Sequence, residues 1–166
     1  MYTAIAAMDK NRVIGNSHND KIPRSFSEDF QWFKEKTVGS PIIMGATTFK
    51  SLKYKPLDGR INIVLSTTLK QEDHKGVLIY KSLAEILNNH PEGYVIGGAQ
   101  IYNLFAEQDL LDEVIITHID GEFEGDVKLP EIEKDMIATP VKKIKAVNRK
   151  EKDGKEYDLE FVNYKR

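Results

Sequence analysis

The pattern of apolar and polar positions divides the chain into short strands and amphipathic helices. Continuous apolar runs such as "YTAIAAM" (2–8) and "PIIMG" (41–45) are typical of strands that are buried on both faces. The predicted strands are 2–8, 41–45, 61–66, 76–80, 94–98 and 112–119, and the predicted helices are 25–36, 46–52, 82–90 and 99–107. Because strands alternate with helices, we expect an α/β fold with a mostly parallel central sheet flanked by helices.

Two segments depart from this alternation. Residues 9–24 show no periodicity and contain glycine, asparagine and proline, so they predict a long loop of the kind that is usually functional. At the other end, 141–150 and 155–165 predict an antiparallel hairpin, because Asp153-Gly154 between them is a strong turn signal. The lysines of this hairpin alternate with acidic residues, which predicts a solvated face.

The helix 25–36 lies in the stretch "IPRSFSEDFQWFK", and its aromatic residues recur at helical spacing. Phe26, Phe30 and Phe33 predict one apolar stripe that faces a core. Asp29 falls in the same stripe, three residues after Phe26 and four before Phe33. A carboxylate among aromatic side chains is a candidate functional group.

The start of this helix also offers an ordinary explanation for the carboxylate. Ser25 and Ser27 are both suitable N-cap residues, and Ser25 with Glu28 predicts a capping box. An aspartate in the first turn complements the helix dipole without any further role. The segment alone therefore leaves both interpretations of Asp29 open.

Composition narrows the class of protein. The 166 residues suit one domain, 1–166, with a real core, and 40% hydrophobic and 30% charged residues are ordinary for a globular chain. A formal net charge of -2 gives no reason to expect nucleic acid or an anionic membrane as a partner. The chain has no cysteine, which excludes disulfides and thiolate chemistry. With neither a signal peptide nor an apolar run of membrane length, we expect a cytoplasmic monomer.

Three predicted strand ends carry residues that suit phosphate binding. Ligands of open α/β sheets bind beyond the carboxyl ends of strands, and a helix that starts after glycine offers free backbone N–H groups. The residues at these ends are Gly45, Thr47 and Thr48; Ser66, Thr67 and Thr68; and Gly97 with Gly98. None of the three is a GxGxxG or Walker motif, and each glycine alone could serve only a tight turn. Together they favour a dinucleotide ligand.

Other catalytic constellations are missing from the sequence. The four histidines, His18, His74, His90 and His118, have no metal-ligand spacing, so we expect no metal, and His118 is expected to be a packed or hydrogen-bonded strand residue. There is no GxSxG elbow. No second carboxylate shares the stripe with Asp29, which disfavours a glycosidase with two carboxylates.

A set of ordered motifs identifies a family. The segments "AIAAMDKNRVIG", "DFQWFK", "PIIMGATTF", "LDGR", "IVLS", "VIGGAQIY" and "ITHID" occur in the order and at the spacing of dihydrofolate reductase of the bacterial type, which the chain resembles over essentially its whole length. The resemblance implies reduction of 7,8-dihydrofolate to 5,6,7,8-tetrahydrofolate by a hydride from NADPH.

The resemblance also implies roles for individual residues. Asp29 would be the lone ionisable group of the pterin pocket, supported by Thr117, and Arg60 would bind the glutamate carboxylate of folate. The remaining substrate residues would be Ile5, Ala6, Phe33, Lys34, Leu52, Ile96 and Tyr102. The cofactor residues would be Ala7, Ile14, Gly15, Gly45, Ala46, Thr47, Thr48, Leu65, Ser66, Thr67, Lys81, Gly97, Gly98, Ala99, Gln100 and Ile101. Residues 9–24 would form a lid over the nicotinamide, and 123–127 would pack against it.

The chemistry of Asp29 agrees with this assignment. A pterin presents two adjacent N–H donors on one edge, and a carboxylate accepts both as a planar pair. Burial is expected to raise the pKa of the Asp29 carboxyl. In the family the hydride goes to a ring carbon while the adjacent nitrogen gains a proton, and the carboxylate promotes that protonation.

Three features depart from the family pattern. The lid contains "GNSHNDKIPRSF", which is longer than usual. Ala46 and Gln100 stand where basic residues commonly bind the 2′-phosphate, so we expect a reduced preference for NADPH over NADH. Arg24 stands where the family almost always has tryptophan. If its side chain points inward, it favours the ionised form of Asp29 and opposes the rise in pKa expected from burial. We expect it instead to point outward into solvent, because burying the charge costs more than one carboxylate offsets.

Two alternatives remain open at this point. A related reductase of the same fold would act on a pyrimidine such as a riboflavin precursor, but Asp29 and Arg60 argue against it. A folate- or nucleotide-binding protein without catalytic activity is made plausible only by Arg24 and Ala46.

Overall fold

The structure is a computed structural model that describes residues 1–17 and 22–166. The strands are β1 (Tyr2–Met8), β2 (Val13–Gly15), β3 (Pro41–Gly45), β4 (Ile61–Leu65), β5 (Val77–Tyr80), β6 (Gly93–Gly97), β7 (Leu111–Ile119), β8 (Val127–Lys128), β9 (Ile137–Val147) and β10 (Glu156–Lys165). The helices are α1 (Ser27–Thr37), α2 (Ala46–Ser51), α3 (Leu83–Asn89) and α4 (Ala99–Glu107), with a 3-10 turn η1 (Gln71–Asp73). None of the described helices is long and apolar enough to cross a membrane. His18 and the centre of the predicted loop 9–24 lie outside the described residues.

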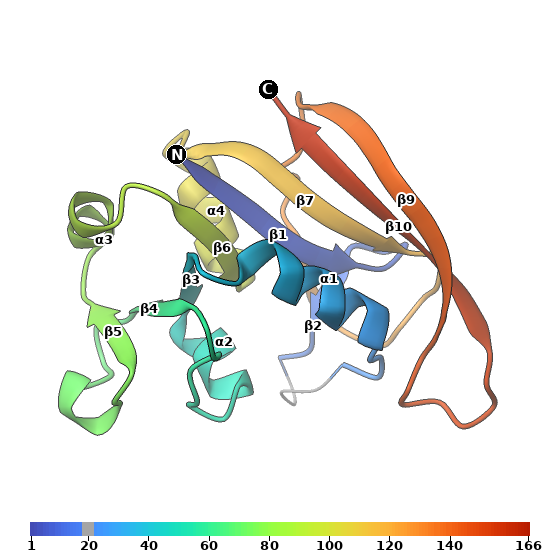
Figure 1. The fold of residues 1–166 in the computed structure, drawn as a ribbon, viewed down its shortest axis with the longest axis horizontal. Coiled ribbons are helices and arrows are strands. Elements are labelled where there is room, and N and C mark those ends of the chain that lie inside the picture. The colour runs from blue at the N-terminus through green and yellow to red at the C-terminus, as the bar shows by residue number, and fades with distance from the viewer. Residues whose placement is uncertain (18–21) are drawn as a thin grey trace. The chain divides into compact units, whose positions relative to one another are not determined.

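Eight strands form one sheet in the order β5-β4-β3-β6-β1-β7-β10-β9, as Figure 1 shows. Strands β5, β4, β3, β6 and β1 pair in parallel, whereas β10 pairs antiparallel with both β7 and β9. The predicted α/β class, with a mostly parallel sheet and an antiparallel C-terminal hairpin, is confirmed. Before the hairpin, the predicted bounds of 2–8, 41–45 and 99–107 match the observed ones, and those of the other predicted strands and helices differ by at most two residues.

The chain divides into two compact units. Unit 1 comprises 1–4 and 37–112, and unit 2 comprises 5–36 and 113–166. The core of unit 1 is built on β3, β4, β5 and α2, with Leu52 and Ile96 packed against a buried cluster of Ile42, Met44, Phe49, Val64 and Val77. These residues follow the continuous apolar runs of the sequence, as expected for strands buried on both faces.

The core of unit 2 includes the inner face of α1. The ring of Trp32 packs on Phe161 of β10 with a centroid distance of 4.7 Å, and Phe26 contacts Tyr157 edge-on at 5.8 Å. The predicted aromatic stripe is therefore wrong in one member, because Phe30 is 60% exposed whereas Trp32 is 7% exposed. Phe26, just before the helix, and Trp32 within it are buried, whereas Asp29 and Phe33 are partly exposed.

The start of α1 also differs from its prediction. The helix begins at Ser27, and the N–H of Ser25, which a capping box would donate to Glu28, has another acceptor. The backbone N–H of Ser25 donates to Oδ1 of Asn148 at 2.8 Å, and Glu28 instead accepts from the hydroxyl of Ser27 at 3.1 Å. Asn148, the residue that follows β9, thus accepts the backbone N–H that Glu28 was predicted to accept.

The segment predicted as the loop 9–24 contains a short strand. Strand β2 pairs antiparallel with β8, which the sequence did not predict because strands of three and two residues show no periodicity. Gly125 lies close enough to this pairing that a Cβ there would stand 2.6 Å from the carbonyl oxygen of Gly15. Ser17 donates its backbone N–H to Asp126 at 2.7 Å. Residues 123–127 therefore pack against 13–17, as the resemblance implied.

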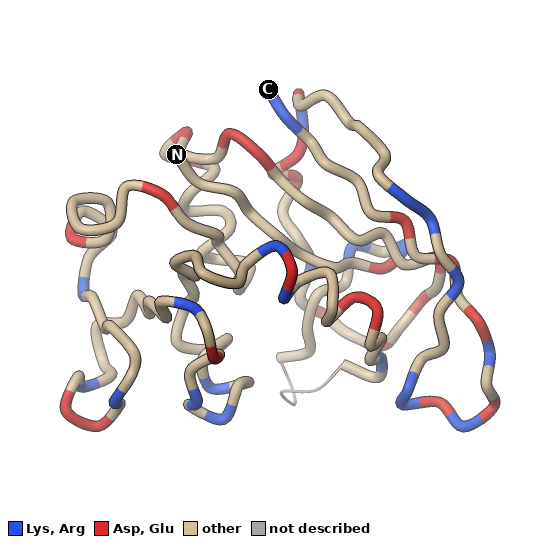
Figure 2. Tube along the Cα trace, viewed as in Figure 1, with Lys and Arg blue, Asp and Glu red and all other residues tan. Residues whose placement is uncertain are grey.

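The C-terminal hairpin is present with different bounds. Strands β9 and β10 pair from Ile137 with Lys165 to Val147 with Glu156, so the connection is the longer loop 148–155 rather than a tight turn. Gly154 adopts φ +70, and Asp153 accepts the backbone N–H of residue 155, so the turn signal acts within this loop. Residues of both charge signs alternate around it in Figure 2. Most of β9 is exposed, which confirms the solvated face.

Candidate active site

Asp29 lies in the first turn of α1 and is bonded to β7. Its Oδ1 accepts a hydrogen bond of 2.7 Å from the hydroxyl of Thr117, which is 2% exposed. Burial raises the pKa of the Asp29 carboxyl above its ordinary value, while the Thr117 hydrogen bond and the charge of Arg24 oppose that rise. The Asp29 carboxyl group can therefore accept further hydrogen bonds. Its contacts with the protein only partly offset the cost of removing it from water.

Arg24 points inward, so the expectation that it reaches solvent is wrong. Its Nη1 donates to the carbonyl of Val13 and its Nη2 to the carbonyl of Ala7, both at 2.9 Å. The guanidinium carbon also lies 5.8 Å from the ring centroid of Phe123. The expectation considered only a carboxylate as the partner of the guanidinium. In the structure, two backbone carbonyls supply the hydrogen bonds that a buried guanidinium needs.

The burial of Arg24 has an electrostatic consequence. Burial lowers the pKa of the Arg24 guanidinium to about 10, and the attraction of Asp9 and Asp29 limits that fall. A group with this pKa keeps its proton at neutral pH. Arg24 is therefore a permanent positive charge inside unit 2.

Asp9 is a second buried carboxylate that sequence reasoning did not single out. It is 3% exposed, and it accepts backbone N–H groups from Asn11 at 2.8 Å, Val13 at 2.9 Å and Phe123 at 2.9 Å. An aspartate that bonds the backbone two residues later is the signature of an Asx turn, so this signal was present in "MDKN". Asp9 fixes the start of the segment 9–17 against the loop around Phe123.

Asn148 fixes the other end of this region and gave no sequence signal. Its side chain is fully buried, its Nδ2 donates to the carbonyl of Pro23 at 2.9 Å, and its Oδ1 accepts from Ser25. Asn148 and Ser25 are 123 residues apart in the chain, so local pattern could not connect them. Arg24 lies between the two residues that Asn148 binds.

The other candidate residues of unit 2 come from β1, β2 and α1. Ile5 is buried, whereas Ala6, Ala7, Ile14, Gly15 and Phe33 are partly exposed. Lys34 is exposed on α1.

Within unit 1 the three predicted strand ends lie side by side. Strands β4, β3 and β6 are adjacent and parallel, with Gly45 opposite Leu65 and Met44 opposite Gly97. The carboxyl end of β3 is thus flanked by those of β4 and β6. This confirms the predicted placement of the glycines and hydroxyls at one sheet edge.

The glycines at these ends are in close contact with their surroundings. A Cβ on Gly45 would lie 2.9 Å from Ile101, and one on Gly97, which has φ +132, would lie 3.1 Å from the hydroxyl of Thr48. Gly45 and Gly98 are the N-caps of α2 and α4, and neither end has a side-chain cap among the described residues. The peptide bond between Gly97 and Gly98 is cis. The first turns of both helices therefore leave backbone N–H groups for a ligand.

The side chain of Ser66 is hydrogen-bonded to the backbone of the turn that begins at this residue. It is 7% exposed, and its hydroxyl oxygen accepts the backbone N–H groups of Thr68 at 3.2 Å and Leu69 at 3.1 Å. The hydroxyls of Ser66 and Thr68 also lie 3.3 Å apart, and either of them can donate to the other. Thr67 and Lys81 are exposed.

The remaining unit 1 candidates differ in exposure. Arg60 donates to the carbonyl of Asp58 at 2.9 Å and to the Thr37 hydroxyl at 3.2 Å. Tyr102 is 3% exposed and lies next to Gly97. In the first turns of α2 and α4, Thr47 and Gln100 are exposed, and Ala46 and Ala99 are partly exposed.

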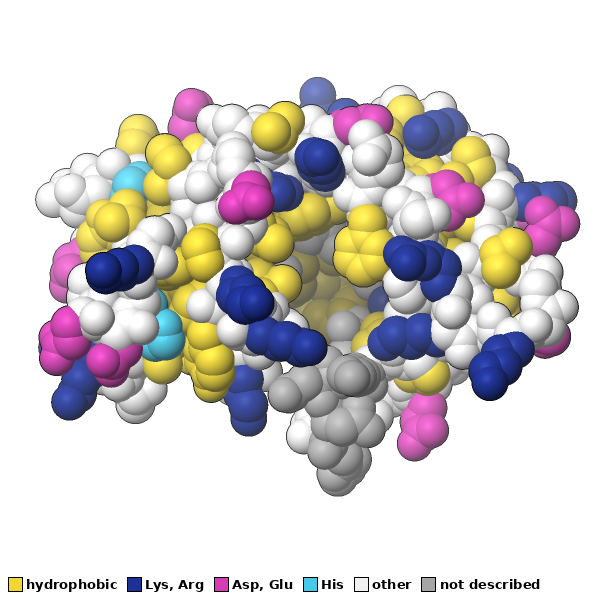
Figure 3. Space-filling model, turned by 60° about the horizontal axis from the view of Figure 1, so that its bottom comes forward, with side chains coloured by type: hydrophobic (Ala, Val, Ile, Leu, Met, Phe, Trp, Pro, Cys, Tyr) yellow, Lys and Arg dark blue, Asp and Glu magenta, His cyan; other side chains and the backbone are white. Residues whose placement is uncertain are grey.

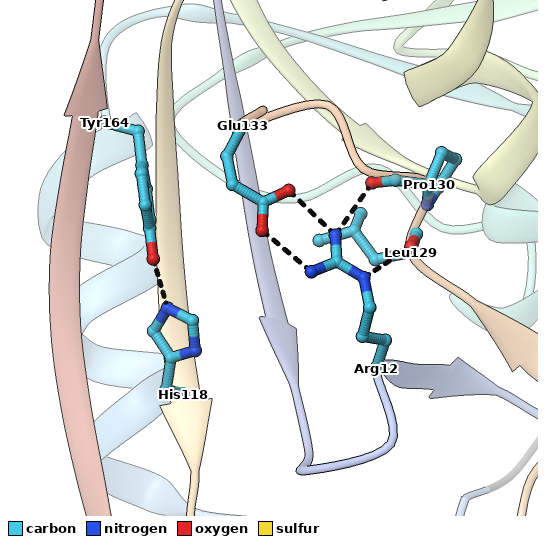
Figure 4. A network of polar contacts seen from close by, with 6 residues as sticks. All are labelled: Arg12, His118, Leu129, Pro130, Glu133 and Tyr164. Carbon is cyan, nitrogen blue, oxygen red and sulfur yellow. Dashed lines mark hydrogen bonds and ion pairs between the residues drawn. The ribbon is translucent and has the colours of Figure 1, made fainter. Parts of the chain in front are cut away.

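A separate polar network in unit 2 is shown in Figure 4. Arg12 forms two hydrogen bonds of 2.8 Å with the carboxylate of Glu133 and also donates to the carbonyls of Leu129 and Pro130. His118 is hydrogen-bonded to Tyr164 at 2.7 Å, which confirms its predicted role. Burial is the largest influence on the pKa of Glu133 and acts to raise it, but the hydrogen bonds and charge of Arg12, a backbone hydrogen bond and the charge of His118 together leave that pKa below its ordinary value. Among the described residues no cluster of metal-ligating side chains is found.

Comparison with known proteins supports one family. Residues 1–166 match the family model described as dihydrofolate reductase. The chain is 37% identical over 171 aligned positions to dihydrofolate reductase of Bacillus subtilis, covering 100% of this chain and 95% of that protein. It is 41% identical over 133 positions to dihydrofolate reductase of Buchnera aphidicola subsp. Acyrthosiphon pisum, covering 76% of this chain and 77% of that protein. A structure of dihydrofolate reductase from Enterococcus faecalis complexed with NADP(H) and RAB-propyl has a TM-score of 0.81 at 28% identity, covering 100% and 96%.

The raised pKa of Asp29 predicts how stability depends on pH. The folded protein binds this proton more readily than the unfolded chain, so the associated stability is present below the ordinary aspartate pKa and is lost as pH rises through the folded value. We expect Asp29→Asn to be more stable than the parent at pH 7 to 8, with an advantage that shrinks toward about pH 4. Urea unfolding at a series of pH values measures this difference.

The control for this measurement is Asp135→Asn. Asp135 is exposed and adopts φ +67, a conformation that asparagine tolerates equally well. Its variant should follow the parent at every pH. If Asp29→Asn also follows the parent, the folded protein does not disfavour the ionised carboxylate.

Proposed function

The chain belongs to the dihydrofolate reductase family, and we propose that it reduces 7,8-dihydrofolate to tetrahydrofolate with NADPH, Asp29 binding the pterin and promoting its protonation. The whole-length family match and the relatives from Bacillus subtilis and Buchnera aphidicola support this reaction over that of a pyrimidine reductase. We further propose that residues 1–166 act as one domain, as a cytoplasmic monomer without nucleic-acid or membrane partners.

The environment of the Asp29 carboxylate supports this function most directly. One of its carboxylate oxygens accepts from Thr117, a neutral donor, and no ion pair of the carboxylate is found among the described residues. The lone pairs that remain suit two adjacent N–H donors of a pterin edge. Because burial disfavours the free carboxylate, bonds to such a ligand would recover part of what desolvation costs.

The raised pKa of Asp29 also suits its proposed chemistry. A carboxyl group that gains a proton more readily than usual can favour protonation of the ring nitrogen next to the carbon that receives the hydride. Thr117 orients the carboxylate through its hydrogen bond. Of the remaining substrate residues in unit 2, Phe33, Ile5 and Ala6 would supply apolar surface.

The residues of unit 1 fit a dinucleotide phosphate. Gly45 and Gly97 occupy positions that a Cβ would crowd, and α4 begins with open backbone N–H groups after Gly98. NADPH, when bound, supplies the hydride. The part of the protein is to bind and orient the cofactor through Gly97, Gly98 and the first turns of α2 and α4, with Ser66 as a further hydroxyl donor. Figure 3 shows lysine and arginine side chains on this face together with aspartate and glutamate side chains.

The direct test of the proposal combines an assay with a variant. The purified protein should oxidise NADPH when dihydrofolate is added, followed by the fall in NADPH absorbance. Asp29→Asn should lose on the order of tens- to thousands-fold of this activity at neutral pH, because the amide presents a donor where the pterin needs an acceptor. Parent-like turnover in the Asn variant would remove Asp29 from the mechanism, and no oxidation by the parent would favour a non-catalytic binding protein.

Arg60 is proposed to bind the glutamate of the substrate. A guanidinium bound to a carboxylate contributes about 1.5–3 kcal/mol, and this contact would be remote from the reacting atoms. Arg60→Ala should therefore raise the Michaelis constant for dihydrofolate by roughly ten- to a hundred-fold and change kcat little. A pterin substrate without the glutamate is the control, and an equal loss on both substrates would show that Arg60 does not bind glutamate.

The preference for NADPH over NADH should be smaller than is usual in the family. Ala46 and Gln100 offer no positive charge to the 2′-phosphate. Ser66 and Thr67 remain as neutral donors, and such donors bind a phosphate less strongly than a guanidinium does. Ala46→Arg should tighten NADPH by about tenfold and leave NADH nearly unchanged. Titration of the intrinsic fluorescence with each cofactor measures both constants. An equal effect on the two cofactors would place residue 46 away from the 2′-phosphate.

A further inference from the structure

Helix α1 packs on a row of residues that crosses three neighbouring strands of unit 2. Thr117 of β7 is the direct partner of Phe161 in β10, and Phe161 is the direct partner of Lys142 in β9. Side chains of directly opposite residues lie on one face of a sheet. Asp29 of the helix accepts the Thr117 hydroxyl at 2.7 Å, and the ring of Trp32 lies 4.7 Å from that of Phe161. The carboxylate and the indole therefore contact adjacent members of the same row.

The spacing of these two contacts matches the geometry of a helix on a sheet. Asp29 and Trp32 are three residues apart, so their side chains lie on the same side of α1 and are separated by an axial rise of about 4.5 Å. Neighbouring strands lie about 4.8 Å apart. One step along the helix thus corresponds to one step from β7 to β10. The packing of Trp32 on Phe161 and the hydrogen bond of Asp29 are geometrically linked.

The contact of Trp32 with the sheet is larger than that of Asp29. Trp32 is 7% exposed and Phe161 is fully buried. The ammonium group of Lys142 lies 5.2 Å from the centroid of the indole and 5.1 Å from that of Phe161, and the ammonium of Lys36 lies 4.5 Å from the indole. Aromatic pairs and cation–π contacts add to the stabilisation that burial gives. Asp29, by comparison, is bonded to the sheet through one hydroxyl.

A second aromatic contact lies before the helix begins. The ring of Phe26 meets those of Tyr157 and Phe123 edge-on, at 5.8 and 6.4 Å. A contact at one end alone leaves a helix free to tilt and rotate about that end. Trp32 supplies the second contact, and Asp29 lies midway between the two, three residues from each.

We propose that Trp32 is a positioning residue for the reaction, because its packing on Phe161 fixes the rotation of α1 that presents the Asp29 carboxylate to Thr117 and to the pterin. This inference deepens the proposed function and rests on it for its biological meaning. The link between Trp32 and the hydrogen bond of Asp29 requires neither substrate nor cofactor, so it can be tested in the free protein.

The first experiment is a double-mutant cycle on the free protein. Trp32→Leu removes the aromatic pair, Thr117→Val removes the hydroxyl that donates to Asp29, and the unfolding constants of the two single variants and the double variant are measured in urea at pH 7 by circular dichroism. Thr117→Val should raise the unfolding constant of the parent by roughly tenfold or more. In the Trp32→Leu protein it should do so by no more than about threefold, because the bond is already displaced. Trp32→Phe, which keeps a ring on Phe161, should restore most of the parent's effect.

Val114→Ala is the matched control for this cycle. Val114 is fully buried on β7 in unit 2, and it faces the side of the sheet opposite to Thr117, since the two are three positions apart along the strand. Thr117→Val should have the parent's effect in this background. The same effect in Trp32→Leu as in the parent, or an equal reduction in Val114→Ala, would overturn the proposal. Phe161→Leu, which removes the other ring of the pair, replaces Trp32→Leu if that variant does not fold.

The second experiment measures the consequence for the reaction. Trp32→Leu should lower kcat/KM for dihydrofolate by about ten- to a hundredfold, as expected when a reacting group is misplaced. The Kd for NADPH should change by less than about twofold, and Trp32→Phe should recover most of the loss. Calorimetry measures this Kd, because Trp32 is the single tryptophan of the chain. Equal losses for substrate and cofactor would contradict a specific effect on Asp29. Because the cycle involves no turnover, its failure is distinct from a failure of the dihydrofolate reductase assay.

Discussion

The rest of the candidate site depends on how one carboxylate, Asp29, is held after it leaves water. Its firm protein contact is the hydroxyl of Thr117 at 2.7 Å, and burial still raises its pKa. A fully bonded carboxylate would be more stable but would have no lone pairs for a ligand. The site thus keeps a charged group whose hydrogen bonding is incomplete, and such groups are characteristic of binding sites that cost some folding stability.

The surrounding segment is ordered by buried polar side chains rather than by regular structure. Asp9 binds three backbone N–H groups, Asn148 binds the backbone on both sides of Arg24, and Arg24 binds two carbonyls. Each of these side chains satisfies backbone groups that a helix or sheet would otherwise satisfy. This is why a segment with little periodicity can still hold the guanidinium of Arg24 against backbone carbonyls inside unit 2.

Sequence pattern predicted the fold well because apolar runs and helical spacing are local. The sequence pattern gave wrong predictions where contacts between residues far apart in the chain determine which side chains are buried. Phe30 has the spacing of a core residue, but the packing of Trp32 on Phe161 sets the buried face. Arg24 was expected in solvent, because a sequence does not show which backbone carbonyls will surround a charge. The glycines at the ends of β3 and β6 were placed correctly, whereas their roles and those of the other site residues remain predictions.

We propose that Asp29 controls protonation of a bound pterin. The most direct measurement is the pH dependence of the hydride step in single turnover, with NADPH and with NADPH deuterated at the transferred position, in the parent and in Asp29→Asn. We predict that the isotope-sensitive rate of the parent falls with rising pH through one apparent pKa above the ordinary aspartate value, and that this dependence disappears in Asp29→Asn. The same pH dependence in both proteins would contradict the account.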